Sequence, residues 1–132
     1  MGCGARWRAE AGVDPTRPAP VMAERMIASY LSDKHLGDLE RQCPMIALPS
    51  DVTRANAEVQ AVYERLLEAM VSLFERSQKP ASKTAKRKAL TVAALCVGGM
   101  VLARTLPNSA LASETREAAR AYAKLLISTK AI

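Results

Sequence analysis

Apolar side chains recur every three or four positions along one long stretch of this chain. Between Asn56 and Ser77 they form a single stripe: Val59, Val62, Tyr63, Leu66, Leu67, Met70, Leu73 and Phe74. Charged side chains fill most of the other positions there. This spacing is that of an amphipathic helix, so we predict a long helix that Asn56 caps and that ends near Ser77.

A shorter helix is predicted over residues 21–31, because four large apolar side chains share one face there: Met22, Met26, Ile27 and Tyr30. Ser32 can cap a further short turn that runs through His35, and Gly37 is expected to end that turn.

A third predicted helix begins near residues 83–85 and ends near Leu106, and its centre, residues 89–102, has almost no polar side. A helix that is apolar all round must be covered all round, and a domain of this size has few helices to do so. A second subunit could supply the remaining cover. Gly98 and Gly99 each cost about 1 kcal/mol in helix propensity. Close approach of another backbone is the usual reason for glycines at such positions.

Residues 107–109 read Pro-Asn-Ser and break the chain, and a last helix is predicted from residue 108 or 109 to Ser128. Its inner stripe is expected to hold Leu111, Thr115, Ala118, Ala119, Tyr122, Leu125 and Leu126. The side expected to face water holds Glu114, Arg116, Glu117, Arg120 and Lys124. Glu117 and Arg120 are three positions apart and can form an ion pair.

Length and composition agree with an all-α domain. The chain has 132 residues, of which 49% are hydrophobic but only 4% aromatic, and strands prefer aromatic and β-branched residues. We expect residues 1–20, which are rich in Pro and Gly, to be an irregular leader. Residues 21–132 are expected to form the single helical domain.

The net charge of +6 raises the prior for an anionic partner. Much of the excess lies in one segment, in Lys79, Lys83, Lys86, Arg87 and Lys88. A solvated interhelical loop is the favoured interpretation, and a phosphate-contacting patch is the alternative.

The three cysteines show no CxxC spacing, so neither a disulfide framework nor a zinc site is predicted. The N-terminus lacks the apolar core of a secretory signal. The longest apolar run, residues 89–103, is shorter than a membrane span requires. We therefore expect a soluble cytoplasmic protein without a membrane partner.

No catalytic constellation is recognisable from spacing. His35 is the one histidine, and a local hydrogen bond or cap is its expected role. We expect neither enzymatic activity nor a cofactor.

The segment from Tyr30 to Asp51 carries a further pattern. Tyr30-Leu31-Ser32 and His35 are followed by Gln42-Cys43-Pro44, an apolar run over residues 45–48, and Ser50-Asp51. It resembles the middle of the ligand-binding domain of TetR/AcrR-type transcriptional repressors. Weaker likenesses follow in order at residues 56–64, 87–104 and 108–120, so the resemblance covers about residues 21–128. The family's glycine before Cys-Pro is Gln42 here, and its helix-turn-helix has no counterpart in residues 1–20.

The resemblance implies an antiparallel helical bundle whose last two helices form a four-helix bundle with those of a second copy. The candidate residues for this homodimer interface are Leu95, Gly98, Gly99, Leu102, Ala118, Tyr122 and Leu125. It also implies a pocket for a small apolar effector, with the candidates Met26, Tyr30, Met45, Tyr63, Leu66, Met70 and Met100. For each of these, plain core packing is the competing interpretation.

The leading hypothesis is an effector-binding and dimerisation domain of a TetR-like repressor that lacks its DNA reader and does not bind an operator by itself. One alternative is a helical interaction module that heterodimerises with intact regulators and antagonises them. Another is a basic helical protein that binds nucleic acid nonspecifically.

Overall fold

The computed structural model describes residue 9, residues 11–14 and 16, and residues 19–37, 49–78 and 83–128. These parts are all-α and contain no strand. The helices are α2 (Pro20–Tyr30), α3 (Asp33–Gly37), α5 (Pro49–Arg54), α6 (Ala57–Arg76), α7 (Lys83–Thr105) and α8 (Ala110–Ser128).

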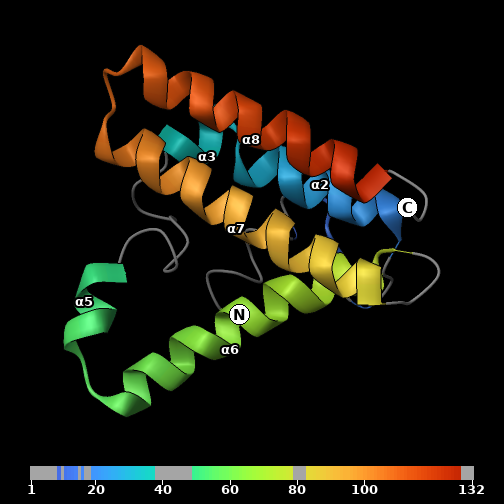
Figure 1. Ribbon diagram of the computed structural model, residues 1–132, viewed down its shortest axis with the longest axis horizontal. Coiled ribbons are helices and arrows are strands. Elements are labelled where there is room, and N and C mark those ends of the chain that lie inside the picture. Colours follow the sequence, from blue (N-terminus) through green and yellow to red (C-terminus); the bar gives the residue numbers. More distant parts are fainter. Residues whose placement is uncertain are drawn as a thin grey trace.

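The last two helices form an antiparallel hairpin, which we call the α7–α8 hairpin (Figure 1). Helix α2 packs along α8, and α3 lies where α2 ends, against α7. The C-terminal half of α6 packs against α7, whereas its N-terminal half diverges from α7 and carries α5 at its far end (Figure 1).

Four helices predicted from periodicity are confirmed to within one or two residues at most ends. Asn56 caps α6 as expected, because its side chain accepts a hydrogen bond from the backbone N–H of Val59 at 3.0 Å. Ser32 caps α3, where its hydroxyl accepts from the N–H of His35 at 3.1 Å, and Gly37 is the last residue of α3. Helix α5 was not predicted, since six residues are too few to show a helical period.

The core lies where α2, α6, α7 and α8 meet. Its largest fully buried side chains are Tyr30, Phe74, Ile27, Leu31, Met100, Val92 and Cys96. Val13 joins this cluster with 4% of its surface exposed, although residues 1–20 show no helical period. Nearby, Arg25 donates a hydrogen bond to the carbonyl of Gly12 at 2.9 Å, and Gly12 adopts a φ of 75° that favours glycine.

The stripe predicted for α6 is buried only over its second half. Met70, Leu73 and Phe74 are buried, but Val59 and Val62 are 42% and 46% exposed. Periodicity identifies the helix and its apolar side, yet it cannot tell how far along the helix other elements reach. In the N-terminal half of that side, the described residues cover only Tyr63 in part.

The inner stripe predicted for α8 is wrong for most of its residues: of the seven, only Ala119 is buried, and Leu126 packs half-buried against the core. The buried residues are Ala112, Arg116, Ala119, Ala123 and Ile127. Leu111, Tyr122 and Leu125 instead lie in solvent, with 71%, 57% and 55% of their surfaces exposed. Small side chains face inward because α8 lies close to its neighbours: a Cβ built at Gly99 of α7 would lie 3.1 Å from the Cβ of Ala119.

Helix α7 is longer than its uninterrupted apolar run. By length and composition, the segment Thr84–Thr105 is long and apolar enough to cross a membrane, whereas the apolar run alone is too short. Core helices of soluble proteins meet the same criterion, and 44% of the most apolar 18-residue window of this segment is buried against the rest of the chain.

Candidate functional site

Exposed or half-buried apolar residues occur along both helices of the α7–α8 hairpin, and we call this set the outer face. Its residues are Leu90, Ala94, Gly98 and Leu102 of α7, Leu106 just after α7, and Leu111, Ala118, Tyr122 and Leu125 of α8. Because the helices are antiparallel, Leu102 and Leu106 lie toward the end that holds Leu111. The other end holds Leu90, Tyr122 and Leu125.

The large side chains of the outer face together expose roughly 600 Å² over the two helices. Four of them, Leu106, Leu111, Tyr122 and Leu125, are more than half exposed. The centre of the face is made of small residues. A Cβ added to Gly98 would meet no atom within 4 Å, so another backbone can approach closely there.

Five of the seven residues predicted for a dimer interface lie on the outer face: Gly98, Leu102, Ala118, Tyr122 and Leu125. Leu95 is half-buried and packs against the core of its own chain. Gly99 is buried, and a Cβ there would lie 3.2 Å from a methyl carbon of Leu31. Gly99 therefore serves packing within the chain, and we leave it out of the outer face.

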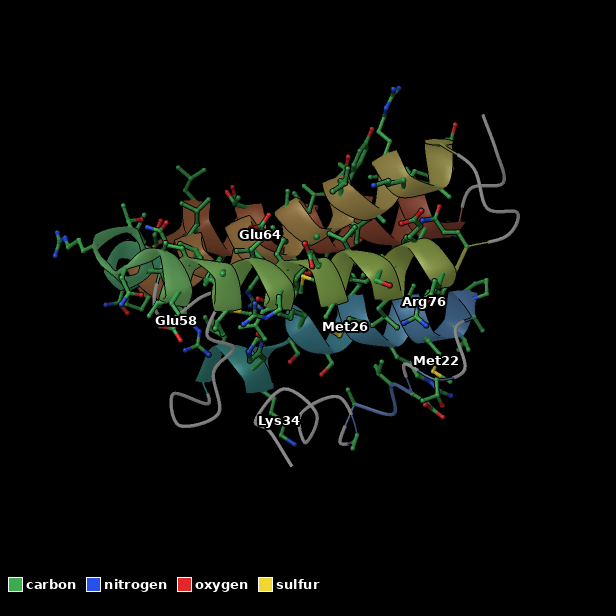
Figure 2. All side chains as sticks on the ribbon, turned by 90° about the horizontal axis from the view of Figure 1, so that it is seen from below. Met22, Met26, Lys34, Glu58, Glu64 and Arg76 are labelled. Atoms are coloured by element: carbon green, nitrogen blue, oxygen red, sulfur yellow. The ribbon has the colours of Figure 1, made fainter. Side chains whose placement is uncertain are left out.

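The seven residues predicted for the effector pocket do not all lie in the same environment. Met26, Tyr30, Met70 and Met100 all belong to the buried core, and Tyr63 packs against it from a half-buried position. Met26 lies one turn from Met22 on α2 (Figure 2). Leu66 is 40% exposed, in the uncovered half of α6. Met45 lies outside the described residues.

The residues of the Tyr-Leu-Ser-x-x-His pattern form the corner between α2 and α3, which we define as residues 30–35. His35 is 3% exposed and its Nδ1 donates to the carbonyl of Tyr30 at 2.6 Å. The two rings meet edge to face, with centroids 4.9 Å apart. The hydroxyl of Ser32 donates to the carbonyl of Ser29 at 2.6 Å. The pattern thus provides side-chain partners for carbonyls at the C-terminus of α2, and the local hydrogen bond expected of His35 is confirmed.

Two arginines from the α7–α8 hairpin complete this corner. Arg116 of α8 donates to the carbonyl of Leu31 at 2.8 Å and to the carboxylate of Asp33 at 2.7 Å. Arg104 of α7 donates to the carbonyl of His35. Arg116 was expected on the solvent side of its helix, but it is 6% exposed. It lies four positions after Ala112, three before Ala119 and seven before Ala123, and this spacing is the signal that could have placed it inward.

Cys96 is fully buried on α7, and burial raises the pKa of its thiol. A thiol held in the protonated form is a poor nucleophile, so Cys96 acts as a small apolar side chain in this core. Cys43 lies outside the described residues.

The basic segment does not form one exposed patch in the described structure. It is helical from Lys83 onward, and Lys88 is 7% exposed while Lys86 and Arg87 face solvent. Among the described residues, no three His, Cys, Asp or Glu side chains come together in a way that could hold a metal ion. The ion pair predicted between Glu117 and Arg120 is present, at 2.9 Å.

Comparison of the chain with known protein families, curated proteins and solved structures finds no match. The function of the chain must therefore be inferred from the geometry of the outer face, the core and the corner.

Proposed function

We propose that this chain is the effector-binding and dimerisation part of a TetR/AcrR-type transcriptional regulator that acts in the cytoplasm. The observation that supports this proposal most strongly is the outer face. The chain places Leu111, Tyr122 and Leu125 of α8 in solvent, which is costly for a protein that works as a monomer.

The geometry of the hairpin fits a second copy of the same chain as the partner. Two antiparallel helices that meet their symmetry mates form a four-helix bundle, and a twofold axis makes the two contact surfaces identical. A standard interface buries about 800 Å² per partner, and the roughly 600 Å² that the large side chains of the outer face expose is of the same order. Gly98 and Ala118, both small, would allow close contact near its centre.

The buried methionines support the effector part of the proposal. Met26, Met70 and Met100 come from three helices and belong to one core, and methionine side chains adapt to ligands of different shape. An effector that fills space among them would displace α7, which also carries half of the outer face. In a regulator with two DNA readers, such a displacement changes the distance between the readers.

Mass measurement by light scattering tests the dimer. We expect twice the chain mass of 14.2 kDa for the wild type at micromolar concentration. Leu102→Glu should give a monomer, because it places a charge in the apolar contact. Val62→Glu is the matched control, since Val62 of α6 is equally exposed at 46% and lies off the outer face. A monomeric wild type, or equal effects of the two variants, would contradict the proposal.

Thermal-shift screening with small apolar compounds tests the effector part. A compound that enters the core should raise the Tm of the wild type and also that of Leu102→Glu, because Leu102 lies outside the core. A screen without any such shift would remove effector binding from the proposal and leave dimerisation standing.

Heterodimerisation with an intact regulator would use the same outer face. The two functions differ in one outcome: an antagonist of that kind is monomeric alone and doubles its mass only when the intact regulator is added. This distinction requires no further variant.

A further inference from the structure

We propose that the corner formed by residues 30–35 is a gate over the methionine-rich core, held shut by Arg104 and Arg116 acting together as one clamp. The gate would regulate the entry of an effector, and in that respect the inference rests on the proposed function. The way in which the two arginines hold the corner does not depend on whether the chain dimerises.

The corner places two of its side chains in the core. Tyr30 and Leu31 are at most 1% exposed, and both belong to the same core cluster as Met100. The side chain of Leu31 also reaches the backbone of α7 at Gly99, where a Cβ would be crowded at 3.2 Å. Withdrawal of these two side chains would open the core from the side of α3.

Polar contacts fasten the corner from two directions. Arg116 reaches it from α8 and binds the carbonyl of Leu31 and the carboxylate of Asp33. Arg104 reaches it from α7 and binds the carbonyl of His35. The hairpin therefore holds the corner through one arginine from each of its helices, and each arginine donates to backbone near the end of α2 or in α3.

The chemistry of these contacts makes the two arginines cooperative. A buried guanidinium that loses its acceptors is strongly unfavourable, so Arg116 must move into water when the corner leaves. The same movement takes the carbonyl of His35 away from Arg104. Intermediate positions weaken both contacts while the guanidinium of Arg116 is still buried, so the corner favours two states, seated and released.

The surroundings give the polar groups of the corner access to water on release. The carboxylate side chain of Asp33 is 91% exposed, so water can replace Arg116 there. The side chain of Lys34 extends from α3 away from the other helices and from the core (Figure 2). Helix α3 has only five residues and can move as one short unit with the corner.

Hydrogen exchange tests the clamp in the full chain. Arg116→Met should speed exchange of the backbone amides of residues 31 and 35 about tenfold or more, while the amides of residues 70–74 in α6 keep their rates. Arg104→Met should act on the same amides. Arg120→Met is the matched control, because Arg120 lies one turn further along α8, is 40% exposed and pairs only with Glu117; it should change neither set.

The single and double variants together decide between one clamp and two separate caps. For a clamp on one corner with two states, each single variant should speed exchange at both residue 31 and residue 35, and the factors of Arg104→Met and Arg116→Met should multiply in the double variant. Two independent caps would each change only the amide nearest to their own contact, and that result would overturn the proposal. Unchanged exchange in both single variants would overturn it as well. If Arg116→Met does not fold, Arg116→Lys, which keeps one charged donor, should give a smaller acceleration in the same amides, and the double variant is then built with it.

Cys96 reports whether release opens the core. In a background where Cys3 and Cys43 are serine, the rate at which a thiol reagent labels the buried Cys96 should rise in Arg116→Met by about the same factor as the exchange at residue 31. Faster exchange without faster labelling would show that the corner moves but is not a gate. A monomeric wild type would contradict the proposed dimer and leave this result unaffected.

Discussion

Adjacent glycines on α7 provide a sharp test of the packing, because they face opposite environments. A Cβ at Gly98 would meet nothing within 4 Å, whereas at Gly99 it would lie 3.1 Å from the Cβ of Ala119 and 3.2 Å from Leu31. Both substitutions to alanine bring the same gain in helix propensity, about 1 kcal/mol. The difference between the two variants therefore isolates packing.

For Gly98→Ala we expect the free energy of unfolding of the monomer to rise by about 1 kcal/mol. For Gly99→Ala the same gain is offset by crowding in a filled core, which typically costs about 1–3 kcal/mol. Leu31 can rotate part of the way, but Ala119 has no side-chain torsion to relieve the contact and α8 itself must shift. We expect Gly99→Ala to be destabilised by up to about 2 kcal/mol relative to wild type.

Urea denaturation followed by circular dichroism, in samples dilute enough to be monomeric, measures both values. The order of the two variants should reverse when association is measured. Gly98→Ala adds a methyl group at the centre of the outer face and should weaken the dimer by about tenfold, equivalent to roughly 1.4 kcal/mol. Equal stabilisation by both substitutions would refute the packing of α7 on α8, and unchanged association in Gly98→Ala would refute its place at the centre of the contact.

Two further predictions concern single side chains. Burial raises the pKa of Cys96, so the folded state keeps the thiol proton that the unfolded state releases above its ordinary pKa of 9.0. Stability should therefore be unaffected below pH 9 and fall by up to about 1.4 kcal/mol per pH unit above it; the slope should be smaller in Cys96→Ala, and equal slopes would refute the assignment. Asn56→Ala removes a cap worth about 1 kcal/mol from α6. Because the first turns of that helix are exposed, hydrogen exchange of residues 57–62 should rise with little change in global unfolding, and a full loss in the urea midpoint would show that this half is packed.

The sequence predicted the helices better than it predicted their inward sides. Three-and-four spacing located α6, and polar breaks with capping residues located its ends. The same spacing failed on α8, where the rule that large apolar residues face the core selected Leu111 and Tyr122 and rejected Arg116. The side of a helix that faces the core depends on how close the neighbouring helices lie. A single sequence does not contain the distances between helices.

The same reason explains the outcome for the candidate site. Gly98 and Gly99 were inseparable in the sequence, since both are glycines in one apolar helix, and only their neighbours distinguish them. The resemblance drew attention to Tyr30, Ser32 and His35, and their hydrogen bonds supply a physical role at the end of α2. The arginines that complete this corner lie about 70 to 85 residues further along the chain, where no local pattern connects them to it.

The arrangement of α8 connects the outer face to the clamp. Because leucines and a tyrosine of α8 face outward, other residues must pack this helix against the rest of the chain. The buried residues on its inward side are three alanines, one isoleucine and Arg116. Alanines allow close approach but bury little area, so they contribute less binding free energy than leucines would. Arg116 adds charged hydrogen bonds, which are strong only while their acceptors stay in place. A helix built in this way is firmly held when the corner is seated and weakly held when it is released. Release of the corner should therefore loosen α8, and with it the outer face that a second copy would contact.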